Sequence, residues 1–291
     1  MEYYGLIILS VVMFGACFAF KDVYRKARGS SLMISMESTF IGGFAGLVAL
    51  LALNGFKFEF TLFTGAVATL AALNSIGFTF FTFKALDKVN LSVFSLFSML
   101  GGMAVPSVVG IIFYNEGITL AKIVCYAFVV AALLLTVNFG VKKAELVLYA
   151  GVFVLNGMSG VLSKIFTSAP FEKTSAAGYS ILAAIITVAV SGGAWLVLYS
   201  IKKDAKAVRP FGMKALCVGA LSGSINKVAN FILVIALAHV PASVQYPMVT
   251  GGVIIVSTLI CFFGARKPGR KEIISVALAF VGMMALFAIP I

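Results

Sequence analysis

Charged residues are scarce in this sequence. Only 11% of its 291 residues are Asp, Glu, Lys or Arg, whereas 62% are hydrophobic. An average soluble domain carries about 25% charged residues, so this composition excludes a single soluble globular domain. It predicts a chain that lies mostly within a membrane.

Groups that carry enzymatic chemistry are also scarce. The chain has one histidine, His239, and its four cysteines (Cys17, Cys125, Cys217 and Cys261) are scattered without a CxxC pair. Such spacing does not predict a metal site or a disulfide framework. The sequence contains no phosphate-binding P-loop, no HExxH motif and no nucleophile elbow. We therefore expect no enzymatic activity, no cofactor or metal site, and no ATP hydrolysis by this chain.

Long apolar runs fill almost the whole chain. About 20 apolar residues span the hydrocarbon core as a helix, and ten such runs are present, separated by short polar breaks such as "KDVYRKARGS" and "LDKVN". They cover residues 3–20, 31–54, 61–84, 91–114, 119–139, 145–166, 174–200, 213–238, 242–264 and 272–290. The first run follows Glu2, without a basic lead-in or a cleavage site, so we expect a membrane helix there and not a signal peptide. The predicted fold is an all-α integral membrane protein with ten transmembrane helices.

Positive charge is concentrated on one side of this predicted topology. The formal net charge is +12. Alternate breaks lie on the same side, and one side holds 17 of the 22 Lys and Arg residues with five acidic residues, whereas the other holds four of each. By the positive-inside rule the basic breaks are cytoplasmic, so both termini are expected outside, most naturally in a bacterial plasma membrane. The positive charge is then expected to set the orientation of the chain in the membrane and to contact anionic lipid. Nucleic acid is not an expected partner.

The two halves of the chain resemble each other. Residues 84–114 match residues 235–264 at a constant offset of 151, which brings Gly101 onto Gly252, and residues 14–21 echo residues 156–164. Five predicted helices per half is an odd number, so the halves, 1–140 and 141–291, would enter the membrane in opposite directions. Inverted repeats of this kind are typical of transporters with a substrate site near the midplane. The alternative is a helical bundle whose repeat is only architectural.

The segment at 80–119, "FFTFKALDKVNLSVFSLFSMLGGMAVPSVVGIIFYNEGIT", carries a family resemblance. It resembles the drug/metabolite transporter superfamily, and its EamA-type members in particular, in which a short Ala/Ser turn precedes a Pro-bearing helix that ends in a Gly-Glu or Glu-Gly step. In this chain these features are Ser92, Pro106 and Glu116-Gly117. The resemblance extends over nearly the full length. It implies ten helices in two five-helix repeats and transport of a small solute by alternating access.

Three features depart from that family. The Trp-Gly pair that members often carry near position 14 is Phe14-Gly15 here. The second half has "ARKPGRKE" where the match to Glu116 suggests an acidic residue. Many members keep their termini inside, whereas the charge pattern places these termini outside. The last departure leaves import and export both open.

Two full charges lie well inside the predicted spans, Glu37 and Lys227. Ionisable residues there are costly and often functional. Counted along the helices, Glu37 lies about 9 Å and Lys227 about 20 Å from the cytoplasmic edge. A zwitterion would fit between them, with its carboxylate at Lys227 and its amine at Glu37. The alternatives are a hydrated or helix-capping Glu37, and a Lys227 that bonds backbone carbonyls or extends to the interface.

Further polar and aromatic residues are expected to complete a midplane layer around Lys227. Asn226 and Asn230 share its helix and are expected to satisfy its remaining hydrogen bonds. In other helices the layer would take its members from Asn74, Ser75, Asn156, Ser159, Gln245 and Tyr246, with Tyr179 and Phe78 among the aromatic residues. Aromatic side chains of this kind cover an apolar or cationic group of a ligand.

The function expected from these residues is secondary transport of a small polar organic solute, with an amino acid or a similar zwitterion as the leading substrate. Two other substrate classes remain open, a hydrophobic or quaternary cation held by Glu37 and aromatic residues, and an anion such as a sugar phosphate held by Lys227. Lys227 would act either as a fixed clamp or as a group that couples proton movement to transport, and exchange with a counter-substrate is the alternative to proton coupling. A non-transporting membrane scaffold is the rival class, and the oligomeric state stays open.

Overall fold

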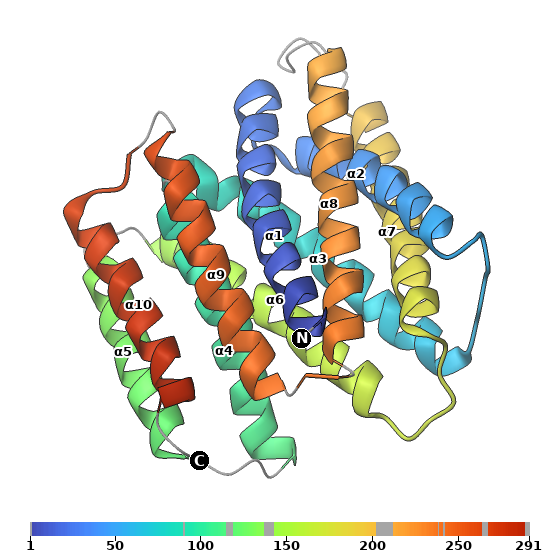
Figure 1. Ribbon diagram of the computed structural model, residues 1–291. Coiled ribbons are helices and arrows are strands. Elements are labelled where there is room, and N and C mark those ends of the chain that lie inside the picture. The colour runs from blue at the N-terminus through green and yellow to red at the C-terminus, as the bar shows by residue number, and fades with distance from the viewer. Residues whose placement is uncertain are drawn as a thin grey trace.

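Ten α-helices make up the computed structural model, which describes residues 2–89, 91–114, 119–136, 143–201, 212–237, 239–240, 242–263 and 267–288 (Figure 1). The helices are α1 (Glu2–Arg28), α2 (Leu32–Leu53), α3 (Leu62–Lys88), α4 (Leu91–Tyr114), α5 (Leu120–Thr136), α6 (Lys143–Ser168), α7 (Ala176–Ile201), α8 (Met213–Leu237), α9 (Ala242–Phe262) and α10 (Arg270–Ala288). No strand occurs in these ranges, so the all-α expectation is confirmed there. The Glu116-Gly117 step and the basic residues at 202–211 lie outside the described residues.

Seven of these helices are long and apolar enough to cross a membrane: α1, α2, α3, α4, α6, α7 and α8. Shorter apolar stretches, Leu120–Ala132 and Met248–Phe262, occupy α5 and α9. The chain is therefore a multi-pass membrane protein. Membrane crossing by α5, α9 and α10 stays a prediction.

The first helix is longer than its apolar run. Residues 21–28, expected to form a polar break, continue α1 as far as Arg28. Lys21, Arg25 and Arg28 repeat at helical spacing and are each less than 9% exposed, because all three point into the protein. The chain then turns at Gly29, where φ is +108°, and Ser31 caps α2 by accepting a hydrogen bond from the Ile34 N–H. The apolar run alone thus underestimates α1, since buried partners for its cations extend the helix.

Helices from the two halves interleave. α1 packs against α8 and α9, and α6 packs against α3 and α4. α2 lies against α7 and α8, α3 against α7, and α4 against α9 (Figure 1). α5 and α10 pack on each other at one side of this group. Eight helices therefore form the body of the protein, and the α5–α10 pair flanks it.

Glycines allow the closest crossings between these helices. A Cβ added to Gly223 in α8 would overlap the backbone of Gly42 in α2, and one added to Gly101 in α4 would overlap the backbone of Phe153 in α6. Without side chains at these positions the helix backbones approach closely, as in other membrane helix pairs. The α2–α8 crossing brings the middle of α8 against α2.

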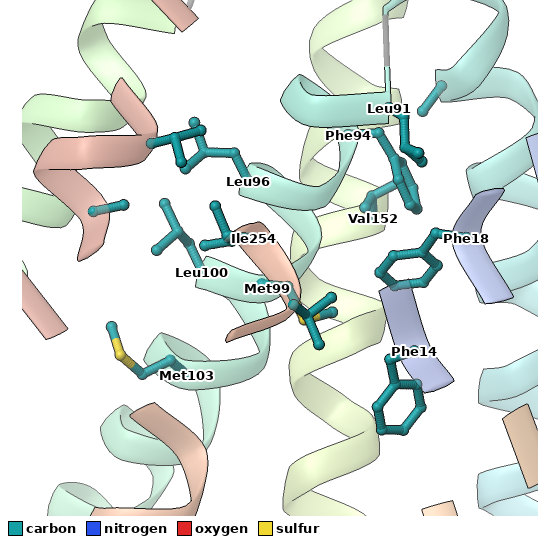
Figure 2. Close-up of a cluster of buried hydrophobic side chains, with 14 of the residues drawn as sticks. Phe14, Phe18, Leu91, Phe94, Leu96, Met99, Leu100, Met103, Val152 and Ile254 are labelled. Carbon is teal, nitrogen blue, oxygen red and sulfur yellow. The ribbon is translucent and has the colours of Figure 1, made fainter. Parts of the chain in front are cut away.

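The largest buried apolar cluster centres on α4 and takes further buried residues from α1, α3, α5, α6, α8, α9 and α10 (Figure 2). Phe18 meets Phe94 edge to face, with ring centroids 5.1 Å apart. Phe14 lies one turn before Phe18 on the same face of α1. This cluster fixes α1 against α4.

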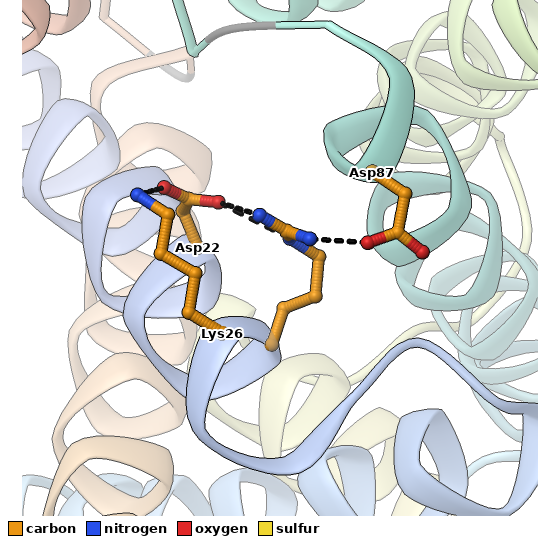
Figure 3. A network of polar contacts seen from close by, with 4 residues as sticks. Asp22, Lys26 and Asp87 are labelled. Atoms are coloured by element: carbon orange, nitrogen blue, oxygen red, sulfur yellow. Dashed lines mark hydrogen bonds and ion pairs between the residues drawn. The ribbon is translucent and has the colours of Figure 1, made fainter. Parts of the chain in front are cut away.

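An ion-pair network holds the last turns of α1 to α3 (Figure 3). Arg25 pairs with Asp22 at 2.7 Å and with Asp87 at the end of α3. Lys26 pairs with Asp22 at 2.5 Å. The basic segment is therefore partly neutralised within the protein and is not a bare cationic loop.

Hydrogen bonds join the α2–α3 connection to the start of α7. The backbone N–H of Ser175 donates to Glu59 Oε2 at 2.7 Å, and the Thr174 N–H donates to Thr64 Oγ1 at 3.1 Å. The hydrogen bonds from Ser175, first from its backbone N–H and then from its side chain, favour the charged carboxylate and keep the pKa of Glu59 below its usual range.

Acidification is expected to open this connection. Because the folded-state pKa of Glu59 is lowered, its contribution to stability is present above the unfolded pKa and is lost as the pH falls through the lowered folded pKa. Hydrogen exchange at the Ser175 amide, compared with that in Glu59→Gln, should show protection at neutral pH that disappears in acid. Glu172→Gln removes a neighbouring charge and should match the wild type. Equal protection in Glu59→Gln at neutral pH would contradict the bond's contribution.

Candidate functional site

A cavity of about 200 Å³ lies among α1, α3, α4, α6, α7, α8 and α9. Nine of the eleven residues expected at the site line it: Lys227, Asn226, Asn230, Ser75, Asn156, Gln245, Tyr246, Tyr179 and Phe78. Ser159 lines it as well. Glu37 and Asn74 are not among the lining residues. The polar layer expected from the sequence thus surrounds one shared space.

The cavity is displaced toward one end of the helices. Its wall includes Leu237, the last residue of α8, together with Tyr179 and Gln245, each the fourth residue of its helix. At the opposite end the wall reaches Lys21, which lies seven residues before the end of α1. Arg25 and its ion pairs occupy the next turn beyond Lys21. The cavity therefore comes within about one turn of the helix ends on the α7 side and stops short on the other.

Lys227 is held between three helices. Its stem packs on Gly46 of α2, where an added Cβ would lie 2.6 Å from Lys227 Cγ. Its Nζ donates to Thr187 Oγ1 of α7 at 3.4 Å, and the side chain remains partly accessible. Asn230 donates to the Asn226 backbone oxygen at 2.8 Å. The expectation that the two asparagines hold Lys227 is corrected, since the ammonium group bonds to Thr187, which the sequence did not single out, and the asparagines bond to each other.

A second lysine, Lys21, enters the same cavity. Its Nζ lies 5.3 Å from the centroid of the Phe78 ring, a cation–π distance. Lys21 begins the polar break "KDVYRKARGS", which was predicted to be cytoplasmic. One signal would have found it, because Phe14, Phe18, Lys21, Arg25 and Arg28 follow one face of a continuous helix. That face changes from aromatic to cationic at the cavity.

Glu37 lies outside the cavity in a buried ion pair. Its carboxylate accepts from Arg28 Nε at 2.8 Å and from the second guanidinium nitrogen at 2.6 Å, and it also accepts from the Tyr24 hydroxyl at 2.6 Å. The side chains of Arg28 and Glu37 are each 4% exposed. This placement corrects the hypothesis that Glu37 meets a substrate amine. The physical reason is that α1 continues as a helix and brings Arg28 to Glu37.

Two asparagines connect α6 to its neighbours. Asn74 donates to the Leu155 oxygen and to Ser159 Oγ, each at 2.9 Å, so its amide joins α3 to α6 and is not on the cavity wall. Asn156 donates to the Ser98 oxygen at 2.7 Å while lining the cavity. Asn74 is thus a packing residue in this structure, whereas Asn156 both packs and faces the site.

The end of the cavity near α7 and α9 is aromatic. Tyr179 stacks on Phe166 with centroids 4.3 Å apart, and the Tyr246 hydroxyl donates to the Gly160 oxygen at 3.2 Å. Gln245 donates to the Leu233 oxygen at 3.0 Å and is 2% exposed. These contacts tie α6, α7, α8 and α9 together around this end of the cavity.

The charge of the cavity has one sign. Lys21 and Lys227 are its charged lining residues, and no Asp or Glu lines it within the part of the chain that the structure describes. In the same described ranges no group of three or more His, Cys, Asp or Glu side chains is placed to hold a metal ion. The site combines two ammonium groups, amides and hydroxyls with aromatic walls. This set can bind and orient a small solute.

Comparison with known proteins identifies the fold but not a family. No family model matches the sequence, and no curated protein matches it. Among 28 chains of known structure that are similar, one crystal structure superposes with a TM-score of 0.64 over 96% of this chain and 94% of the other, at 19% sequence identity. At that identity the likeness bears on fold alone. The helical architecture therefore has experimental precedent over nearly the whole chain.

Proposed function

We propose that this chain is a secondary transporter, an EamA-type member of the drug/metabolite transporter superfamily, that carries a small polar organic solute across the membrane by alternating access. The observation that carries the proposal is the polar cavity at the junction of the two halves. The first half supplies α1, α3 and α4 to its wall, and the second half supplies α6, α7, α8 and α9. Polar side chains deep among apolar helices are costly and mark solute pathways.

The helix contacts support two inverted repeats. Each helix of one half corresponds to the helix five numbers away in the other half. Under this correspondence the α1–α8 contact matches the α6–α3 contact, the α1–α9 contact matches α6–α4, and the α2–α8 contact matches α7–α3. The α2–α7, α4–α9 and α5–α10 contacts convert into themselves. A pseudo-two-fold relation between residues 1–140 and 141–291 produces this pattern, and a bundle of unrelated helices has no reason to do so.

Individual glycine contacts follow the same relation. A residue of α1 corresponds to the residue of α6 that lies 142 positions later, and a residue of α4 corresponds to the residue of α9 that lies 151 positions later. The contacts are Gly15 with Val256, Gly157 with Val105, Gly252 with Val11, and Gly101 with Phe153. Each pair on one interface thus has a counterpart on the other.

An inverted repeat offers a physical route to alternating access. If the halves exchange conformations, a cavity displaced toward one end moves toward the other. If both termini lie outside, as the charge pattern predicts, the end of the cavity near the starts of α7 and α9 faces outward. A C-terminal reporter that is active only in the cytoplasm should then stay silent, and an active reporter would reverse the orientation.

Proteoliposomes containing the purified full-length protein test the function. We expect counterflow of at least one solute from a panel of amino acids, organic acids, amines and sugar phosphates, and loss of that flux in Lys227→Met. Flux measured with and without a pH gradient separates proton coupling from exchange with a counter-substrate. A protein that moves none of these solutes would support the rival scaffold class.

Replacing Gly46 with alanine should impair transport by displacing Lys227. The new methyl group would lie 2.6 Å from Lys227 Cγ and 2.9 Å from its Cβ, so the lysine stem has to move. Displacement of a binding group by about 1 Å can cost tenfold or more in rate, and we expect at least about a tenfold loss of flux. Gly193→Ala in α7, where nothing lies within 4 Å, is the matched control. Equal flux in the two variants would show that the position of Lys227 does not matter.

A further inference from the structure

We propose that the solute held in this cavity is a small organic anion, and that Lys21 and Lys227 together bind its negative group. The inference rests on the proposed function for its transport step, but the binding site that it names can be tested separately. Both lysines line the same cavity and come from different halves of the chain, Lys21 from α1 and Lys227 from α8.

The acidic residues closest to this part of α1 are already paired. Asp22 pairs with Arg25 and Lys26, Asp87 pairs with Arg25, and Glu37 pairs with Arg28. No described salt bridge includes Lys21 or Lys227. The protein thus neutralises the cations beyond the cavity and leaves the two inside it without a carboxylate partner among the described residues.

The contacts that the two ammonium groups do make are with neutral groups. Lys227 donates to the Thr187 hydroxyl, and Lys21 lies over the Phe78 ring. The positive charge of Lys21 also acts on Lys227, so the two groups repel each other. Buried charges require compensation by an opposite charge. An anion bound by both ammonium groups adds two attractions that offset the repulsion between them, and it supplies charged acceptors.

The rest of the wall fits an organic body attached to that anionic group. Phe14 and Phe18 of α1 (Figure 2) line the cavity together with Lys21, and Phe78 of α3 lines it as well. Asn156 and Asn226 supply amide groups. A carboxylate or phosphate monoester on a short aliphatic or aromatic skeleton combines these features. A bare inorganic ion would leave the aromatic wall unused.

The other two substrate classes fit less well. A cation would meet two ammonium groups and no described carboxylate. A zwitterion would satisfy the lysines with its carboxylate, but its amine has no anionic partner, because Glu37 is outside the cavity and bound to Arg28. Because Glu37 lies outside the cavity, the preferred substrate class is an anion and not a zwitterion.

Thermal unfolding of the purified full-length protein, with probes matched in skeleton and different in charge, tests the inference. One set is benzoate, benzamide and benzylamine, a second is succinate, succinamide and 1,4-diaminobutane, and a third is glycerol 3-phosphate and glycerol, all at 10 mM and equal ionic strength. We expect at least one anion to raise the midpoint by about 3 °C or more through preferential binding to the folded state, and its neutral and cationic counterparts to have no effect. The shift should vanish in Lys21→Met and in Lys227→Met. It should persist in Lys267→Met, which removes an exposed lysine.

The wild-type panel decides the result even if a lysine variant fails to fold. Stabilisation by an amine or an amide equal to that by its matched anion overturns the inference, as does an absence of stabilisation by every anion. A shift that survives in the folded Lys21→Met and Lys227→Met variants also overturns it. Binding of an anion without flux in proteoliposomes would reject the transport function and leave the anion site standing. Flux of an amine or a zwitterion, with the anions inert, would leave transport standing and reject the anion site.

Discussion

Lys227→Met is expected to abolish transport and, at the same time, to stabilise the folded protein. The lysine bonds to the Thr187 hydroxyl and is repelled by Lys21, so its charge is poorly compensated among apolar helices. Methionine keeps the length of the stem that packs on Gly46 while removing the charge. The gain in unfolding free energy should be up to about 2 kcal/mol, because a lysine at the centre of a membrane helix costs about 3 kcal/mol and this one retains some access to the cavity.

Flux in proteoliposomes and the midpoint of thermal unfolding measure these two effects separately. Flux should fall about 100-fold or more, since the charged group is lost from the site. Lys227→Arg keeps the charge but puts a larger planar group where the ammonium group meets Thr187, and it should transport poorly. Lys267→Met should change neither quantity. Normal flux in Lys227→Met at every pH tried would show that this lysine is structural and that the proposed site is wrong.

Glu37→Gln should have the opposite pair of effects, a large loss of stability with little loss of transport per folded molecule. The substitution leaves the Arg28 guanidinium buried without its carboxylate. Breaking a buried ion pair by removing one partner costs about 3 to 5 kcal/mol, and α1 would lose its strongest link to α2. Transport should persist because Glu37 is not part of the cavity wall.

A double-mutant cycle tests whether the unpaired charge of Arg28 causes the loss of stability. Arg28→Met together with Glu37→Met removes both charges and should recover most of the lost stability, since an apolar pair of similar size often replaces a buried ion pair without penalty. Tyr24→Phe removes one hydrogen bond to Glu37 and should cost only about 1 kcal/mol. If Glu37→Gln folds with normal stability and loses all transport, the carboxylate acts on the solute, and the original interpretation of Glu37 regains support.

One face of α1 connects these predictions. Phe14 and Phe18 pack in the core and reach the cavity wall, Lys21 enters the cavity, and Arg25 and Arg28 pair with α3 and α2 beyond it. The same helix therefore carries a candidate solute contact and the ion pairs that lie beyond the cavity. Lys21→Met removes the contact without touching those ion pairs, which makes it the cleaner test of the two-lysine site.

The number of helices, their approximate ranges and most of the polar residues of the cavity wall could be predicted from the amino-acid sequence alone. These properties are local, because an apolar run of sufficient length forms a helix in a membrane whatever its neighbours are. Nine of the expected residues line one cavity for a related reason. A polar side chain in the middle of an apolar helix avoids lipid, so it turns toward the protein interior or a cavity.

The bonding partner of each polar group could not be predicted in this way, because it depends on how the helices pack. A charge within a helix needs compensation, but the sequence does not say which helix supplies it. Glu37 pairs with Arg28 because α1 continues past its apolar run, and the same continuation places Lys21 at the cavity. Asn74 bonds to α6, and Lys227 of α8 bonds to Thr187 of α7 while its stem packs on Gly46 of α2. Partners of this kind depend on crossings between helices that are far apart in the sequence, and those crossings are set by packing over whole interfaces rather than by any local pattern.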